Sequence, residues 1–440
     1  MSIESTVLDR IKPTEAEVKK IEDTAARLKD TVCKYLSEHD LSVDVRFVGS
    51  FAKGTFLSDP DLDLFLLFPE EVPRKELESI GLQVGSDVLG GVRMYAEHPY
   101  TRGVYGGLDV DLVPSYDISS TEKLRTAVDR TPFHTNYVLE NMKDEQKDEV
   151  RLLKAFMKGI DVYGAEPNTR GFSGYLCELL IIRYGSFLDV LENVKDWKEG
   201  TTITLDKRGP PGIGALIVYD PVDQRRNVAS AVHIDTLSLF IVAAKAYLQN
   251  PSQKFFFPEK RDPLPKEKLE SLSERNGSRM VTVIFERPDT IEDNLYSQLW
   301  KTRYALTRKL NDFDYNVLRS VHEMYDDTLE IAFEIERDVL SKTYKHVGPP
   351  VWVKAAESFL SKWKDNEFGP PFIEEGCWNV IVERMYFTAK EMLTDEAAIS
   401  GIGRELNPNT MKVRDHVSSL ENTDRGLLTE LMDSKRSWEI

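Results

Sequence analysis

A helical pattern of apolar residues opens the chain. Between residues 14 and 37 the apolar side chains recur at spacings of three and four residues. Thr14 and Glu17 stand where a capping box would close the first turn. We therefore predict an amphipathic helix, whose apolar stripe must be covered by a sheet or by other helices. The stripe consists of Val18, Ile21, Ala25, Leu28, Val32 and Tyr35.

Strand patterns follow this helix. Val43, Val45 and Phe47 alternate with polar residues, which predicts a strand that runs into Gly49. Two further apolar runs cover residues 62–68 and 108–113. Three strand candidates around one helix predict a small mixed α/β domain over about the first 140 residues.

Beyond residue 140, helical patterns, strand patterns and breaker-rich loops follow one another. Residues 147–184 are mostly helical in pattern, and breaker-rich loops lie at 207–214 and 251–260. A strand is predicted at 280–285 and a helix at 300–310. Gly-Pro-Pro sequences at both ends of 347–371 enclose a further predicted helix, which suggests an inserted subdomain.

These patterns predict an α+β, multi-domain protein. A small mixed sheet with helices is followed by a helical central domain and then by α/β C-terminal domains. The expected domains are 1–140, 141–258, 259–322 joined with 390–440, and an inserted tail subdomain at 323–389.

Composition narrows the class of protein. The chain has 440 residues, of which 41% are hydrophobic and 30% charged, as in ordinary globular proteins. No run approaches the roughly 20 uncharged apolar residues that span a bilayer, and the first residues lack a signal-peptide pattern. The three cysteines form no CxxC motif or Cys/His cluster. We expect a cytoplasmic protein with no membrane partner and no zinc site.

The formal net charge of −17 counts against a nucleic-acid partner, because phosphate binding depends on lysine and arginine. A net-acidic protein can nevertheless carry a local basic groove. The candidates for such a groove are Lys301, Arg303, Arg308, Lys309 and Arg319. Alternatively, these basic residues form the solvated face of an amphipathic helix.

The residues that indicate a catalytic site lie between positions 47 and 68. Strand side chains alternate between faces, so Asp61 and Asp63 point to the same side while Leu62 and Leu64 point into the core. Two adjacent carboxylates repel unless a divalent cation neutralises them. Magnesium, which binds a few carboxylates together with substrate phosphate oxygens, is the ion we expect.

A lone D-x-D motif more often belongs to a solvated strand edge than to a metal site. Two features favour the metal. Gly49-Ser50 ends the preceding strand, where glycine lets the backbone approach a phosphate. A third acidic strand carries Asp109 and Asp111 on one face, and spacing alone leaves open which of the two is the third ligand. Three carboxylates beside a Gly-Ser turn are typical of two-metal phosphoryl transfer.

These residues have the Gly-Ser, D/E-x-D and distant-Asp pattern of the DNA polymerase beta-like nucleotidyltransferase superfamily. More closely, the chain resembles the archaeal, class I CCA-adding enzymes, which are tRNA nucleotidyltransferases. The matching blocks occur in order from about residue 47 to 300. They are FVGSFAKGTF, DLDLFLLFP, YAEHPY, DVDLVPSY, AVDRTPFH, EVRLLKAFMK, VYGAE, RGFSGYLCELL, DPVDQRRNVA and EDNLYSQL.

The resemblance implies a polymerase-beta-like catalytic domain at the N-terminus, a nucleotide-binding central domain and RNA-binding C-terminal domains. It implies that two Mg²⁺ ions are held by three carboxylates, with Asp111 rather than Asp109 as the third. The remaining pocket would hold the incoming nucleotide, with Arg226 on the base edge. Relatives often carry Glu at the position of Asp61 and Arg at that of Lys53. The implied residues are Asp61, Asp63 and Asp111 for metal and catalysis, and Gly49, Ser50, Lys53, His134, Lys154, Tyr163 and Arg226 for the nucleotide.

The implied reaction is template-independent addition and repair of the 3′-terminal CCA of tRNA. CTP is used twice and ATP once, and pyrophosphate is released each time. The implied partners are CTP, ATP and the acceptor arm and 3′ end of tRNA, and a homodimer is left open. A poly(A) or oligoadenylate polymerase is one alternative, and a catalytically inactive RNA-binding scaffold is another.

Overall fold

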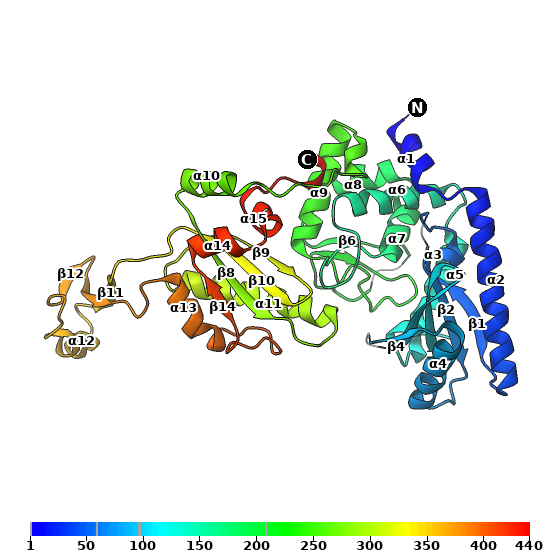
Figure 1. The fold of residues 1–440 in the computed structure, drawn as a ribbon, viewed down its shortest axis with the longest axis horizontal. Helices are drawn as coiled ribbons and strands as arrows, with labels where there is room; N and C mark the ends of the chain where they lie inside the picture. The colour runs from blue at the N-terminus through cyan, green and yellow to red at the C-terminus, as the bar shows by residue number, and fades with distance from the viewer. Residues whose placement is uncertain (1, 59, 96–97, 207–208) are drawn as a thin grey trace. The chain divides into compact units, whose positions relative to one another are not determined.

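The computed structural model describes residues 2–58, 60–95, 98–206 and 209–440. Lys207 and Arg208, the first residues of one predicted loop, lie outside the described residues. The chain divides into two compact units: an N-terminal unit of Met1–Lys260 with Arg436–Ile440, and a C-terminal unit of Arg261–Lys435 (Figure 1). The finer boundaries predicted above stay predictions. Within the described parts of the chain, every helix is too short or too polar to cross a membrane.

A five-stranded mixed sheet organises the first part of the N-terminal unit. Its strands lie in the order β1-β2-β5-β4-β3, with β2 and β5 parallel and the other neighbours antiparallel. Three of the strands were predicted, whereas β3 and β4 were missed because their short runs contain polar residues and glycine. The strands are β1 (Asp44–Val48), β2 (Leu62–Phe68), β3 (Val92–Tyr95), β4 (Pro99–Tyr105) and β5 (Leu108–Tyr116).

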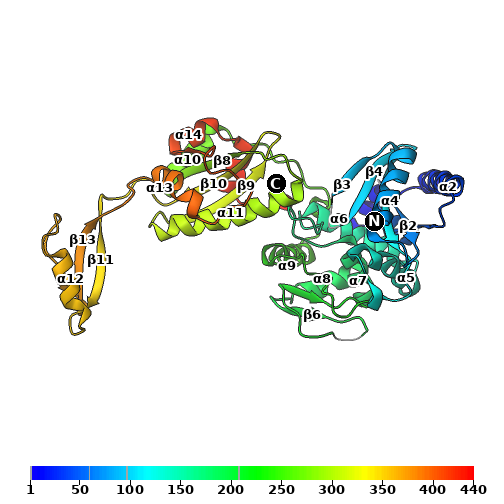
Figure 2. The ribbon, with the colours of Figure 1, turned by 90° about the horizontal axis from the view of Figure 1, so that it is seen from below.

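Two helices cover one face of this sheet. The predicted capping box closes helix α2 (Glu15–Glu38): Glu17 N–H donates to Thr14 Oγ1, and Thr14 N–H donates to Glu17. Helix α4 (Arg74–Leu89) packs beside α2 against the same sheet face (Figure 2). The even-numbered residues of β2 point into this core, so its odd-numbered positions lie on the other face.

The second part of the N-terminal unit is mainly helical, as predicted. Its core contains Phe156, Phe187 and Phe240 from three helices, and Trp438 near the C-terminus stacks on Phe255 at 5.2 Å. A two-stranded parallel ribbon of β6 (Thr201–Ile203) and β7 (Leu216–Val218) adjoins the helices. The helices of this unit not yet given are α1 (Ile3–Ile11), α3 (Gly49–Lys53), α5 (Thr131–Asn141), α6 (Gln146–Gly159), α7 (Gly174–Tyr184), α8 (Phe187–Val194) and α9 (Ile234–Gln249).

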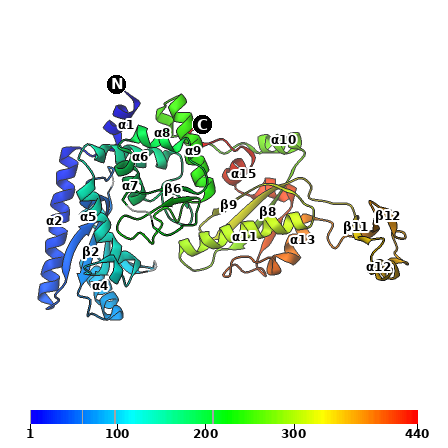
Figure 3. The same ribbon diagram turned by 180° about the vertical axis from the view of Figure 1, so that it is seen from behind.

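The C-terminal unit contains a four-stranded antiparallel sheet in the order β14-β8-β10-β9. Apolar cores lie on both of its faces, and α11 crosses it (Figure 3). Helix α11 begins at Glu292, before the predicted start at Trp300. The elements are α10 (Lys266–Asn276), β8 (Arg279–Glu286), α11 (Glu292–Asp312), β9 (Val317–Met324), β10 (Thr328–Ile335), α13 (Ala389–Glu396), β14 (Lys412–Arg414), α14 (His416–Asn422) and α15 (Arg425–Met432).

A small three-stranded sheet is inserted between β10 and α13 of this unit. Its strand order is β11-β13-β12, and the predicted helix within 347–371 is present as α12. His346 stacks on Phe359 of this helix at 5.9 Å, which joins the helix to the sheet. The elements are β11 (Thr343–Pro350), α12 (Ala355–Trp363), β12 (Phe372–Glu374) and β13 (Cys377–Glu383).

Acidic residues offset part of the predicted basic stretch. Lys309 pairs with Glu396 at 2.7 Å, and Arg319 pairs with the buried Glu334 at 2.6 Å. These two cations are therefore already neutralised within the C-terminal unit. Arg303 instead lies over the ring of Trp300, with 4.1 Å between guanidinium carbon and ring centroid.

Candidate active site

The acidic residues gather on the face of the five-stranded sheet that α2 and α4 leave uncovered. In the parallel β2/β5 register Asp63 lies beside Asp111. Their neighbours Leu62, Leu64 and Leu112 are buried in the helix-covered core. This burial fixes the alternation, so both carboxylates point to the opposite face. The tertiary structure thus makes Asp111, rather than the exposed Asp109, the neighbour of Asp63.

The carboxylates destabilise one another in their charged forms. Burial, and then the charge of Asp111, raise the pKa of Asp63 to about 7. Burial likewise raises the pKa of Asp61. A divalent cation would remove this repulsion, and carboxylate oxygens are the donors that magnesium prefers.

Gly49 allows the turn after β1 to approach Asp63 closely. Its φ is +70°, and a Cβ at this position would lie 1.8 Å from Asp63 Oδ2. A side chain is therefore excluded here on grounds of both conformation and space. The glycine was predicted to make room for a phosphate. The structure places a carboxylate against it, and Ser50 follows in the short helix α3.

The carboxylate oxygens are donors of the type that magnesium prefers, although Arg102 competes for one of the carboxylates. Arg102 on β4 donates from Nε and Nη2 to the two carboxylate oxygens of Asp111, at 2.7 Å each. Across the residues that the structure describes, no three acidic, histidine or cysteine side chains converge as a ready metal cage. The three carboxylates of Asp61, Asp63 and Asp111 supply hard oxygen donors, and Arg102 already binds the carboxylate of Asp111.

Two lysines surround a fully buried glutamate where α3 meets the helical part of the same unit. Lys53 Nζ donates to Glu178 Oε2 at 2.5 Å, and Thr55 Oγ1 donates to Oε1 at 2.6 Å. Lys154 Nζ lies 3.8 Å from Oε1 and donates to the Thr55 carbonyl at 3.1 Å. Burial raises the pKa of Glu178, but the two lysines outweigh it and the net pKa is lowered. The glutamate is therefore held ionised.

Tyr175 connects this cluster to a second buried carboxylate. Lys53 Nζ lies 5.8 Å from the centroid of the Tyr175 ring, which stacks on His134 at 4.0 Å. His134 Nε2 lies 2.9 Å from Asp220 Oδ2, and Arg226 Nη1 donates to the same oxygen at 3.0 Å. Burial lowers the pKa of His134 despite the Asp220 charge, which favours the neutral ring.

Tyr163 lies at the same junction. A Cβ on Gly174, at the start of α7, would lie 3.0 Å from the Tyr163 hydroxyl and 3.7 Å from Lys154 Nζ. Lys53, His134, Lys154 and Arg226, most of which are far apart in the sequence, are thus connected through Glu178, Tyr175 and Asp220, and Tyr163 lies near Lys154 at Gly174. Their roles in nucleotide binding stay predictions.

Four residues that the structure brings to these sites were not selected from the sequence: Arg102 beside the carboxylates, and Tyr175, Glu178 and Asp220 among the lysines, His134 and Arg226. No local pattern marks them, since each contact depends on how strands and helices meet in the fold.

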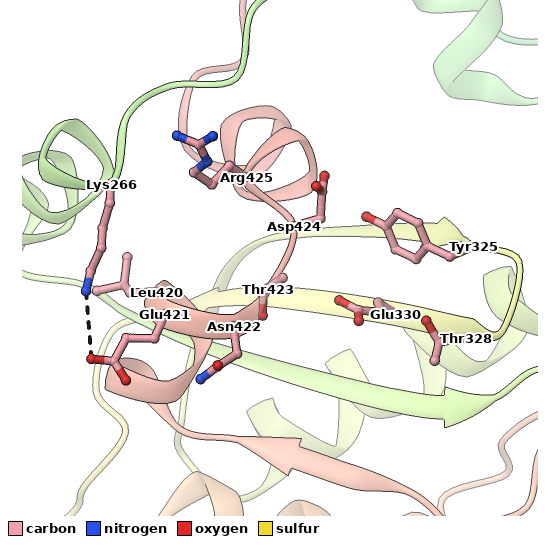
Figure 4. Close-up of a pocket in the computed structure, with 10 residues that line it drawn as sticks. All are labelled: Lys266, Tyr325, Thr328, Glu330, Leu420, Glu421, Asn422, Thr423, Asp424 and Arg425. Atoms are coloured by element: carbon pink, nitrogen blue, oxygen red, sulfur yellow. Dashed lines mark ion pairs between the residues drawn. The ribbon is translucent and has the colours of Figure 1, made fainter.

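A separate pocket lies within the C-terminal unit (Figure 4). It has a volume of about 530 Å³ and is bordered by the end of α14, the start of α15 and the β9/β10 hairpin. Burial raises the pKa of Glu330 on its wall, and Lys266 pairs with Glu421 at its edge at 3.7 Å. The pocket lacks the paired carboxylates and the Gly-Ser turn of the sheet, so it is not the candidate catalytic site.

A mixed sheet with adjacent carboxylates beside a Gly-Ser turn is suited to metal-dependent phosphoryl transfer, as expected of a nucleotidyltransferase. The comparisons with known proteins agree. A nucleotidyltransferase domain matches residues 27–134, the second domain of tRNA nucleotidyltransferase matches 148–257, and the C-terminal domain of CCA-adding enzyme matches 276–415.

Curated relatives identify the family within this class. The CCA-adding enzyme of Methanosarcina barkeri is 38% identical over 91% of this chain and 90% of its own length. That of Methanosarcina mazei is 39% identical over 92% and 91%, and that of Archaeoglobus fulgidus is 36% identical over 87% and 86%. The chain belongs to the CCA-adding enzyme family and is a tRNA nucleotidyltransferase. The predicted family, fold class, enzyme class and function in tRNA CCA addition are confirmed.

Proposed function

We propose that this enzyme builds and repairs the 3′-terminal CCA of tRNA with two Mg²⁺ ions, adding two cytidylates from CTP and one adenylate from ATP. The tRNA 3′-hydroxyl attacks the α-phosphate of the nucleotide, a new phosphodiester bond forms, and pyrophosphate leaves. The observation that carries this proposal is the Asp63–Asp111 pair in the β2/β5 register. No finding favours the poly(A) polymerase or the inactive scaffold.

Asp61, Asp63 and Asp111 would hold the metal ions. Bound magnesium would neutralise the phosphates and lower the pKa of the attacking hydroxyl. The chain's own contribution is a fixed arrangement of oxygen donors, since buried leucines on alternate positions hold the strands in register. The Asp63 carboxylate lies against Gly49, where the absence of a side chain leaves room for it.

Ser50, Lys53, Lys154 and Tyr163 would bind the triphosphate, and His134 and Arg226 the nucleoside. The support is that Lys53, Lys154, His134 and Arg226 are connected around Glu178, Tyr175 and Asp220, with the Tyr163 hydroxyl near Lys154 at Gly174. A neutral His134 can donate one hydrogen bond and accept another, and the guanidinium of Arg226 can meet acceptors on a base edge. Protein side chains would thus select the base without a template strand.

The C-terminal unit would hold the acceptor arm of the tRNA. The match of its residues 276–415 to the C-terminal domain of CCA-adding enzyme supports this assignment. Duplex RNA is recognised mainly by shape and by phosphate contacts, which a net-acidic protein can supply through local basic groups. We expect this work to take place in the cytoplasm, and we leave a homodimer open.

The deciding experiment offers the purified enzyme magnesium and a tRNA that lacks its last three nucleotides. We expect two cytidines with CTP alone, and a single terminal adenosine only when ATP is also present. Long adenosine tails with ATP alone would assign the chain to the poly(A)-type enzymes. No incorporation by the wild type would favour the scaffold.

A matched pair of variants tests the metal assignment in the same assay. Asp111→Asn removes the carboxylate beside Asp63, while Asp109→Asn makes the same change two residues away on the same strand face. We expect Asp111→Asn to reduce incorporation by at least about 10³-fold and Asp109→Asn by less than about tenfold. Equal losses in the two variants would contradict the assignment of Asp111.

A further inference from the structure

The carboxylate proposed as the third metal ligand already has a cationic partner. Arg102 and Asp111 lie directly opposite one another in the antiparallel β4/β5 register. The guanidinium meets the carboxylate through two parallel hydrogen bonds of 2.7 Å each, so both oxygens are engaged. The Arg102 guanidinium therefore supplies the positive charge that a metal ion would otherwise bring to Asp111.

The two partners differ in their freedom to move. The Asp111 side chain is 14% exposed and is held by the sheet between β2 and β4. The Arg102 side chain is 46% exposed, and its position on β4 leaves it open to solvent. A long, half-exposed arginine can leave the carboxylate by rotation about its side-chain bonds without disturbing the sheet. The carboxylate cannot move in the same way.

We infer that Arg102 is an exchangeable counterion that neutralises Asp111 before metal loading and must leave it when the metals bind. This inference rests on the proposed function, because it requires Asp111 to be a metal ligand. The guanidinium engages the lone pairs that face it on both carboxylate oxygens, and its positive charge repels a divalent cation brought to the same carboxylate.

The exchange has two consequences for the enzyme. Arg102 reduces the repulsion between Asp63 and Asp111 in the metal-free protein, since it adds a positive charge at their shared face. It also weakens the apparent affinity for metal, because each binding event must break the ion pair. Arg102 is thus a positioning residue that acts on the site through Asp111.

The test measures metal binding without turnover. Mn²⁺ is titrated into the full-length wild type, Arg102→Gln and Arg102→Lys, and the free ion is followed by electron paramagnetic resonance. We expect Arg102→Gln to bind Mn²⁺ about three- to thirty-fold more tightly than wild type, the range for one charge-assisted ion pair. Arg102→Lys should fall between them, since an ammonium keeps the charge but loses the two-pronged contact.

Arg46→Gln is the matched control. Arg46 lies on β1 of the same sheet and forms an exposed pair with Asp44 at 3.0 Å. Its removal should leave Mn²⁺ affinity unchanged. Weaker or unchanged binding in Arg102→Gln, with circular dichroism like that of wild type, would overturn the inference while leaving the metal site intact. If wild type binds no Mn²⁺, or if Asp111→Asn binds it as well as wild type does, the metal assignment itself fails and the inference falls with it.

Discussion

Lys53 donates to Glu178 over a distance of 2.5 Å, although 125 residues separate them in the chain. The pair joins the short helix after the first strand to the helical part of the N-terminal unit. Lys154 approaches the same carboxylate from α6. One buried carboxylate thus faces two lysine side chains beside the acidic face of the sheet. Burial lowers the pKa of Lys154, and the charge of Glu178 opposes that shift.

The first prediction concerns the stability of this cluster. Glu178→Gln leaves two buried lysines without their counterion, and the loss of one partner of a buried ion pair typically costs 3–5 kcal/mol. We expect the free energy of unfolding at pH 7 to fall by about 3 kcal/mol, measured by urea denaturation. Glu192→Gln serves as the control, because Glu192 forms an exposed pair with Lys195. It should change stability by less than about 0.5 kcal/mol.

The stabilisation by Glu178 should depend on pH. The pKa of Glu178 is lowered in the folded state, so its ionised form stabilises the native protein above the unfolded pKa, near 4.5. That contribution is lost as the pH falls through the lower native pKa. The stability difference between wild type and Glu178→Gln should therefore be constant from about pH 5.5 to 7.5 and shrink below about pH 4.5. A difference that grows in acid would show that the glutamate is protonated in the fold.

Gly49→Ala tests the close approach of the turn to Asp63. The new methyl group must displace the Asp63 carboxylate, since its position lies 1.8 Å from Oδ2. We expect incorporation to fall at least about 100-fold, because small displacements of reacting groups have effects of this size. Gly90→Ala is a matched control: Gly90 has a similar φ of +58°, but a Cβ there meets nothing within 4 Å. It should lose only about 1 kcal/mol of stability and keep its activity.

Asp220→Asn tests whether the buried carboxylate positions the nucleotide-binding side chains. The change removes the charge that His134 and Arg226 share. We expect the KM for CTP and ATP to rise about tenfold or more while kcat falls less, since a charge-assisted hydrogen bond contributes about 1.5–3 kcal/mol. Asp223→Asn is the control, because Asp223 pairs with Arg130 and Arg225 instead. Equal effects on KM in the two variants would contradict a specific role for Asp220.

Local features of the fold could be predicted from the sequence. The capping box of Thr14 and Glu17 and the alternation along Leu62–Phe68 involve residues only a few positions apart, and both are present. The candidate carboxylates followed from the same alternation, since Asp61 and Asp63 must share a face. The choice between Asp109 and Asp111 required the pairing of β2 with β5, or the likeness to a family.

The sequence by itself determined the opening helix, the helical character of residues 147–184, three strands of the five-stranded sheet, the acidic motif and the family. These properties depend on periodicity and on short motifs, which side-chain direction and backbone conformation encode locally. Only the tertiary structure decided that Arg102 neutralises Asp111, that Glu178 lies between two lysines, and that Asp220 joins His134 to Arg226. An ion pair depends on which strands and helices meet and on how deeply the pair is buried, and short sequence patterns do not encode either condition.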